Sequence, residues 1–318
     1  MKKTQVAKKL IPAVALLCLT PLISSAEALI LGVMIAVILG NPYLEITKVW
    51  TSKLLSWSVI GLGAGMNLMV VAKVGLEGIG YTFIGITWAL ILGLVLGKIL
   101  KVEENTSILI SGGTAICGGS AIAALAPTIR AKSHEISVSL GVVFLLNAVA
   151  LVIFPMVGHW LNMTQHQFGL WSALAIHDTS SVVGAAMQFG DEALRVGTTT
   201  KLARALWIVP LTLIIGYFTA KRNHTDGQVK VKAKRPWFIL GFLLMAALVT
   251  FVPALAEPGH YIEMVAKKAL VLTLFLIGLG LSRESLKAVG PRALIQGLTL
   301  WILVAVSTLA AIQVGWIH

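Results

Sequence analysis

Charged residues are scarce in this 318-residue sequence. Asp, Glu, Lys and Arg make up 12% of it, about half their share in an ordinary globular chain, while apolar residues make up 57%. Cysteine is scarcer still. Cys18 and Cys117 both lie inside apolar runs, so neither a disulfide framework nor a paired-cysteine zinc site is expected. This composition excludes a soluble enzyme, a secreted scaffold and a DNA-binding domain, and it predicts an integral membrane protein.

Apolar runs near the length needed to cross about 30 Å of hydrocarbon recur along the chain. We expect nine spans, at residues 10–26, 28–41, 54–72, 80–98, 135–157, 196–219, 236–256, 263–281 and 292–316. The expected fold is therefore an all-α polytopic membrane protein forming a single membrane domain. Its first half, residues 1–220, contains two further broken segments. A basic cytoplasmic loop at 221–235 separates it from helices at 236–318.

The two broken segments, 106–129 and 168–190, are apolar but rich in Gly, Ser and Thr. They either cross the membrane or enter and leave it on one face. If they are re-entrant, most of the 25 Lys and Arg fall on the side of the N-terminus, whereas full crossing would move Arg130 and Lys132 to the other side. The charge rule thus favours re-entrant hairpins and a cytoplasmic N-terminus in a bacterial inner membrane. The first segment imitates a signal peptide, but we favour its retention as a helix.

Two pairs of stretches within the chain resemble each other. Ala115–Ile122 matches Ala175–Val182 at Ala, Ile and Ser, and Ile60–Gly63 weakly matches Ile277–Gly280. Chance recurrence of small and apolar residues is the alternative. In the charge-derived topology the members of each pair run in opposite senses, which is the construction of inverted-repeat transporters with interrupted helices.

The first interruption is a glycine-rich run, Ser111–Ser120, with four glycines. Glycine costs about 1 kcal/mol relative to alanine inside a helix, so the run predicts a break. If Gly118 and Gly119 open a half-helix at Ser120, its first N–H groups form an anion site. Tight helix packing through small residues is the alternative. Cys117 is as well explained by packing as by a role as a ligand.

The second interruption contains Asp178, the only acidic residue inside an apolar segment. A carboxylate in the membrane costs roughly 2.5–3.5 kcal/mol and is by default a candidate functional group. Asp178 and adjacent His177 could accept and release a proton. Alternatively, Asp178 or Thr179 caps a half-helix, and the two roles are compatible.

Two basic residues, Lys201 and Arg204, lie within the span 196–219, and their spacing of three places them on the same face of a helix. Either could pair with Asp178, attract an anion, or extend to the outer interface. Asn67 and Asn147 could line a cavity or join helices. Enzyme and nucleotide templates are absent from the sequence: no HExxH, no GxSxG and no Gly-Lys-Ser/Thr loop occurs, so we expect neither an enzyme nor a cofactor or metal.

Several motifs together resemble those of a known family. They are Gly113–Ala124 followed by Ala126-Pro127, Phe168–Trp171, Ala175–Thr179, and Lys201–Arg204 followed by Pro210. They are similar to the YeiH-like bacterial membrane proteins of the UPF0324 group, whose members are often described as candidate sulfate exporters. The resemblance covers about residues 28–316. It implies the cation/proton antiporter and anion transporter superfamily, with an inverted-repeat fold.

The expected function is secondary transport of a small anion, sulfate or an organic sulfonate, driven by a proton or sodium gradient. The expected substrate-binding residues are Thr114, Gly118, Gly119, Ser120, Thr179, Ser180, Lys201 and Arg204, with Asp178 and His177 coupling the ion. The rivals are a cation/proton antiporter and a non-transporting membrane scaffold or receptor. Partners are the anion, the coupling ion and the bilayer, with no nucleic acid, and the sequence leaves homo-oligomer formation open.

Overall fold

The computed structural model describes residues 2–222, 237–280 and 290–317, and in these ranges the chain is all-helical. The helices are α1 (Lys2–Leu17), α2 (Ser25–Ile38), α3 (Leu44–Leu62), α4 (Leu68–Ile99), α5 (Glu104–Ala115), α6 (Gly119–Thr128), α7 (Ser133–Trp160), α8 (Gln165–Ala175), α9 (Thr179–Phe189), α10 (Asp191–Ala205), α11 (Ile208–Arg222), α12 (Trp237–Phe251), α13 (Ala256–Gly280) and α15 (Pro291–Gln313). The predicted loop 221–235 and the weak repeat beyond Gly280 fall largely outside the described residues.

Four helical stretches of the described chain are long and apolar enough to cross a membrane: 78–99, 134–160, 191–217 and 291–313. A bent pair, 237–251 with 253–280, makes a fifth if it forms one span. A polytopic membrane protein is therefore supported, but nine spans and an inverted repeat are not confirmed.

Several predicted span limits are wrong. The run 54–72 is not one helix, because α3 ends at Leu62 and a 3₁₀ turn follows at Gly63–Gly65. Asn67 then caps α4 by accepting from the N–H of Met69 at 2.8 Å. Asn67 is therefore an exposed helix cap, and it fulfils neither of the two predicted roles, lining a cavity or joining helices. The run 10–26 is also divided: α1 ends at Leu17, and α2 starts at Ser25 with a Ser24–Glu27 capping box.

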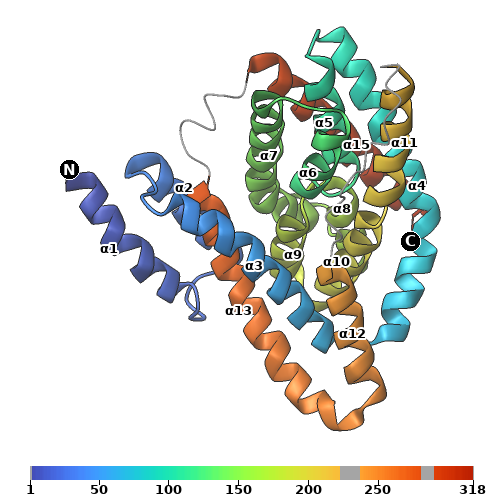
Figure 1. Ribbon diagram of the computed structural model, residues 1–318. Coiled ribbons are helices and arrows are strands. Elements are labelled where there is room, and N and C mark those ends of the chain that lie inside the picture. The colour runs from blue at the N-terminus through green and yellow to red at the C-terminus, as the bar shows by residue number, and fades with distance from the viewer. Residues whose placement is uncertain (1, 223–236, 281–289, 318) are drawn as a thin grey trace.

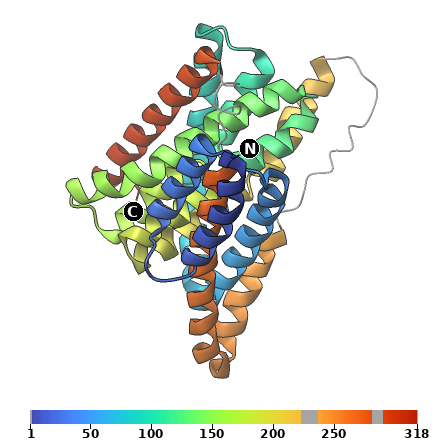
Figure 2. The same ribbon diagram turned by 90° about the vertical axis from the view of Figure 1, so that its left-hand side faces the viewer.

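The helices form two lobes (Figure 1). In the small lobe, α13 packs along α2 and α3, α12 packs against α3, and α1 covers α2 and α13 with its apolar face. At the crossing of α2 and α13, a side chain on Gly32 would collide with the backbone of Phe275 and Gly278. The large lobe contains α4 to α11 and α15. Figure 2 shows the small lobe lying across the front of the large one. Each lobe thus combines helices from both sides of the central loop.

Helix α7 is the axis of the large lobe. Its 28 residues extend about 42 Å, enough to cross the hydrocarbon core. Its first residues contact the linker before α5, where His134 Nε2 lies 3.1 Å from Glu103 Oε2. Its last turn contacts the end of α9, where His159 stacks on Phe189 with ring centroids 4.3 Å apart. Two broken helical segments are therefore attached at opposite ends of α7.

Candidate functional site

Both broken segments fold as helical hairpins. The first hairpin is α5–α6 and the second is α8–α9, with breaks at residues 116–118 and 176–178. The start of the second hairpin contacts the first turn of α10, which directly follows α9, where the N–H of Glu192 donates to Gln165 Oε1 at 2.9 Å. The matching stretches occupy equivalent places, since Ala115 and Ala175 end the first arms and Gly119 and Thr179 begin the second arms. The predicted interruptions are thus present.

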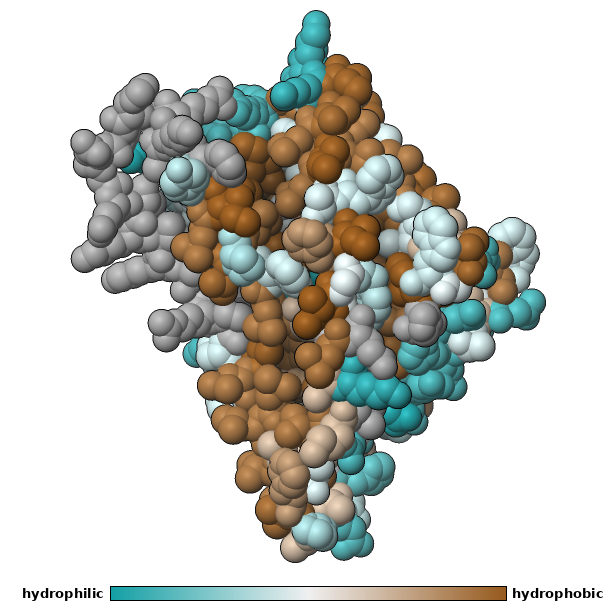
Figure 3. All heavy atoms as spheres, turned by 90° about the vertical axis from the view of Figure 1, so that its right-hand side faces the viewer, coloured by the Kyte–Doolittle hydropathy of each residue, from teal (hydrophilic) through white to brown (hydrophobic). Residues whose placement is uncertain are grey.

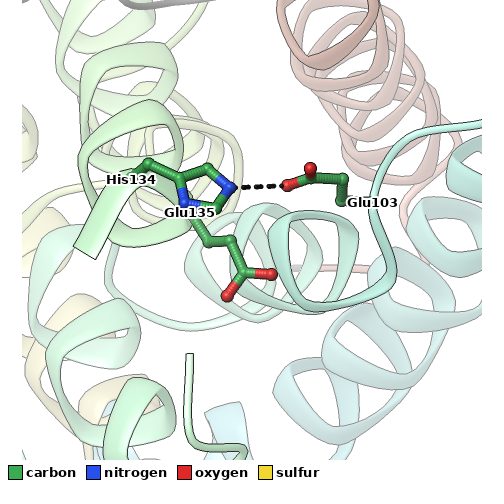
Figure 4. A group of neighbouring side chains, drawn as sticks. All are labelled: Glu103, His134 and Glu135. Carbon is green, nitrogen blue, oxygen red and sulfur yellow. Dashed lines mark hydrogen bonds and ion pairs between the residues drawn. The ribbon is translucent and has the colours of Figure 1, made fainter. Parts of the chain in front are cut away.

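The base of the first hairpin is tied to α7 by a polar cluster of Glu103, His134 and Glu135 (Figure 4). The ligand atoms of these side chains lie within 4.8 Å of one another. The Glu135 carboxylate is already engaged, because it accepts from Asn105 Nδ2 at 3.1 and 3.2 Å and from the Lys132 N–H at 2.5 Å. We therefore interpret the cluster as a fastening between the hairpin and α7.

Replacing Glu135 with alanine is expected to lower the free energy of unfolding by about 1–3 kcal/mol, because the part-buried hydrogen bonds from the Asn105 amide and the Lys132 N–H to this buried carboxylate are lost. Glu103→Ala is the matched control. Its side chain is 63% exposed, and its pair with His134 is expected to contribute less than about 1 kcal/mol. Thermal melting in detergent measures both, and equal shifts for the two variants would contradict the fastening role.

The tips of the two hairpins meet near the middle of α7. The Nε2 of His177 lies 3.0 Å from the hydroxyl oxygen of Thr114, and the N–H of Asp178 donates to Asn147 Oδ1 at 3.2 Å. A Cβ on Gly118 would lie 3.4 Å from the Cβ of Asp178. Gly118 has φ +61°, a conformation that side chains rarely adopt, so glycine permits both the turn and the close crossing.

The carboxyl ends of α5 and α8 are capped by the two basic residues of α10. Arg204 donates through Nε to the Ala115 carbonyl at 2.7 Å and through Nη1 to the Leu174 carbonyl. Lys201 donates to the carbonyls of Ile176 at 2.6 Å and Ala173 at 3.3 Å. Arg204 therefore bridges both hairpins, and each cation lies at the negative end of a half-helix.

Both cations are fully buried, Lys201 with 0% and Arg204 with 1% of the residue exposed. The alternative that they extend to the outer interface is therefore wrong. They bond to main-chain carbonyls, whereas Asp178 has other partners. Arg204 still has an unpaired donor, since Nη2 has no hydrogen-bond partner in the described chain.

The amino ends of α6 and α9 differ. Asp178 caps α9 by accepting from the N–H of Ser180 at 3.1 Å and from its hydroxyl. Gly118 precedes α6 and has no side chain that could cap it, so the N–H groups of Gly119 and Ser120 have no intrahelical partner. The N–H of Ala121 in the same turn is directed at the sulfur of Cys117. Gly119 is partly exposed and Ser120 is exposed, while Thr179 and Ser180 are buried. Asp178 is the only partly exposed residue between Phe168 and Ala186.

The surroundings of two other candidate residues, Cys117 and Asn147, indicate structural roles. Cys117 is buried in an apolar cluster, as packing requires. Asn147 joins α7 to the second hairpin, with its Nδ2 unpaired. Sequence reasoning missed Gln296 of α15. Its Nε2 donates to the Gly93 carbonyl at 2.9 Å and to Ser107 Oγ at 2.8 Å, which joins α4, α5 and α15.

Known proteins are similar in sequence to this chain along its whole length. The profile of the family described as Conserved hypothetical protein 698 matches residues 7–297. A UPF0324 membrane protein of Bdellovibrio bacteriovorus is 64% identical over 318 residues, which cover 100% of this chain and 98% of that protein. The chain belongs to the UPF0324 family of membrane proteins.

Other UPF0324 relatives come from distant bacteria. One from Geobacter sulfurreducens is 47% identical over 94% of both chains, and one from Vibrio parahaemolyticus is 48% identical over 93% of this chain and 94% of its own. No solved structure matches the chain. The family membership predicted from the motifs is confirmed, and the relatives are named membrane proteins, in agreement with the apolar helices of this chain.

Proposed function

We propose that this UPF0324 protein is a secondary transporter of a small anion, with sulfate or an organic sulfonate as the substrate class. The observation that carries the proposal is the uncapped amino end of α6, which is accessible at Gly119 and Ser120 where the two hairpin tips meet. Free N–H groups and the positive helix end are a ready anion site.

The electrostatic balance of the tips favours an anion. Lys201 and Arg204 offset the negative carboxyl ends of α5 and α8, and Asp178 offsets the positive amino end of α9. Among the described residues, no carboxylate accepts from the N–H groups of Gly119 and Ser120 at the positive end of α6, because the neighbouring Asp178 carboxylate accepts from Ser180. In this proposal the anion accepts from the N–H groups of Gly119 and Ser120, and from the Ser120 hydroxyl.

The structure narrows the roles proposed for the other predicted residues. Ser180 donates to Asp178, and Thr114 pairs with His177, so both act in the proposal by holding the tips together. Lys201 and Arg204 do the same through the main-chain carbonyls. Of the eight predicted anion ligands, the proposal therefore keeps Gly119 and Ser120 as direct ligands, since the N–H of Gly118 already donates to the Gly113 carbonyl at 2.8 Å.

Asp178 is the proposed coupling group, with His177 beside it. Asp178 is a partly exposed residue, and its Cβ lies next to Gly118 at the start of the proposed anion site. A bound anion repels an ionised carboxylate, so binding of the anion and binding of a proton or Na⁺ at Asp178 favour each other. A gradient of the coupling ion would thereby drive the anion, without ATP.

The proposed topology places the N-terminus in the cytoplasm and the hairpins as re-entrant segments from opposite faces of the inner membrane. Its support is the attachment of the hairpins at opposite ends of α7, together with the predicted charge bias of the loops. Nine crossings arranged as an inverted repeat remain part of the proposal. Rocking of the small lobe against the large one would alternate access to the tips.

The test uses the full chain in proteoliposomes. Uptake of radiolabelled sulfate is expected when a pH or Na⁺ gradient is imposed, and sulfate is expected to raise the melting temperature of the purified protein. A Na⁺ or proton exchange signal that is independent of any anion would instead indicate the cation/proton antiporter. Absence of both uptake and stabilisation, over a panel of inorganic and organic anions, would remove the anion proposal.

Replacing Gly119 with alanine is expected to weaken anion binding about tenfold, equivalent to about 1.4 kcal/mol. The new Cβ would lie 3.1 Å from the ring of Phe144 and displace the start of α6. Gly80→Ala is the matched control, because a Cβ there meets nothing within 4 Å. Isothermal titration with the stabilising anion measures the effect, and equal affinities in the two variants would contradict the placement of the site.

A further inference from the structure

An apolar cavity of about 580 Å³ lies between α4, α10–α11 and α12. Its walls include Val71 and Ala72 from α4, Leu202 and Ala203 from α10, and Phe242 from α12. Among the lining side chains, polar atoms are confined to Thr199 and Trp207. The Thr199 hydroxyl is already directed at the sulfur of Met66, at 3.9 Å.

The walls select the chemistry of an occupant. A polar or charged molecule would lose its hydration in this cavity and find almost no hydrogen-bond partners, at a cost of several kcal/mol. A hydrocarbon chain instead gains about 25 cal/mol for each Å² removed from water. The cavity therefore suits a purely apolar segment, and it is chemically distinct from the polar hairpin tips.

The mouth of the cavity lies among side chains that face the bilayer. Leu76, Ile79 and Leu206 line it while remaining 70%, 51% and 51% exposed. Leu240 of α12 and Leu213 of α11 are also exposed on these helices, at 62% and 64%. Figure 3 shows this side of the molecule as largely hydrophobic. A lipid tail can thus enter from the bilayer without crossing a polar surface.

We propose that this cavity binds one acyl chain of a bilayer phospholipid. The occupant follows from the apolar walls, the volume, and the opening among lipid-facing side chains. This proposal requires only that the protein resides in a membrane, so a test of lipid binding is independent of whether the protein transports an anion.

The position of the cavity gives the lipid a structural effect. Leu202 and Ala203 line it, and they are the residues between Lys201 and Arg204, which hold the hairpin tips. Phe242 on the opposite wall belongs to the small lobe. The acyl chain therefore packs between the lobes and supports α10 from the side opposite the tips.

Photolabelling tests this site. The full chain is reconstituted in phosphatidylethanolamine and phosphatidylglycerol vesicles that contain a phospholipid with a diazirine in its acyl chain, then irradiated and mapped by peptide mass spectrometry. Labels are expected on residues 199–210 and 239–243. The double variant Ala72→Phe/Ala203→Phe, which fills the cavity, should lose these labels several-fold. Ala310→Phe makes one such substitution at an exposed position on α15 and should retain them.

Native mass spectrometry provides a second measurement if the double variant does not fold. The wild-type protein in mild detergent is expected to retain one phospholipid, and the milder Ala203→Leu variant is expected to retain less. Equal labelling of the filled and control variants would overturn the proposal. So would retention of a free fatty acid or of no lipid by the wild-type protein.

Discussion

Replacing Arg204 with alanine is expected to abolish anion uptake and to lower the free energy of unfolding by about 2–6 kcal/mol. The guanidinium is fully buried and donates to the carbonyls of Ala115 and Leu174, one in each hairpin. Each buried carbonyl that loses its donor costs about 1–3 kcal/mol. Without the bridge, the two tips also lose their fixed relative position.

Arg204→Lys separates charge from geometry, because an ammonium keeps the charge but lacks the fork that reaches two carbonyls. We expect intermediate stability and severely reduced uptake. Arg195→Ala is the control on the same helix, since Arg195 is exposed. Thermal melting and sulfate uptake in proteoliposomes measure both quantities. An Arg204→Ala protein that melts and transports like Arg195→Ala would show that the bridge is dispensable.

Replacing Asp178 with asparagine is expected to abolish gradient-driven uptake while changing the melting temperature little. An asparagine oxygen can still accept from the N–H of Ser180, so the cap of α9 survives, but the group can no longer bind a proton or cation. Asp178→Ala removes the cap as well, and it should cost about 1 kcal/mol more than the asparagine variant.

The two Asp178 variants therefore distinguish a coupling group from a helix cap. A pure cap predicts normal uptake in Asp178→Asn and a defect only in Asp178→Ala. Asp191→Asn is the matched control, because Asp191 also starts a helix but is exposed and pairs with Lys267 at 2.8 Å. Uptake by Asp178→Asn that equals wild-type uptake would contradict the proposed coupling role of Asp178, and loss of no activity or phenotype in this variant would favour the non-transporting scaffold or receptor.

The hairpin breaks could be predicted because their cause is local. Glycines at 118 and 119 disfavour a continuous helix, and His177 and Asp178 place polar side chains in an apolar run. The capping role of Asp178 was also recognisable, since Asp is a preferred residue before a helix. The structure adds that the two breaks touch, which required the length of α7 and its attachments at both ends.

The partners of the basic residues could not be predicted. The spacing of Lys201 and Arg204 placed them on one face, but the Ala115 carbonyl is 89 residues away and the Leu174 carbonyl is 30 residues away. Main-chain carbonyls carry no sequence signal. Gln296 was missed for the same reason, because its partners Gly93 and Ser107 lie on distant helices.

Span limits failed where hydropathy and backbone preference disagree. The run 54–72 is apolar throughout most of its length, but Gly61, Gly63 and Gly65 lower its helical preference, and Asn67 supplies a cap for a new helix. Hydropathy detects residence in the membrane and does not detect such turns. The predicted span 28–41 corresponds to α2, which is apolar but, with 14 residues, shorter than a helix that crosses the membrane.

The bridge from Arg204 to Ala115 also constrains how the protein is made. Ala115 leaves the ribosome 89 residues before Arg204, a delay of roughly 5–18 s at bacterial elongation rates. Throughout this interval the nascent first hairpin carries an unpaired carbonyl at its tip. We therefore expect the tip of the first hairpin to reach its final packing only after α10 has emerged, which makes this step of membrane assembly a late one.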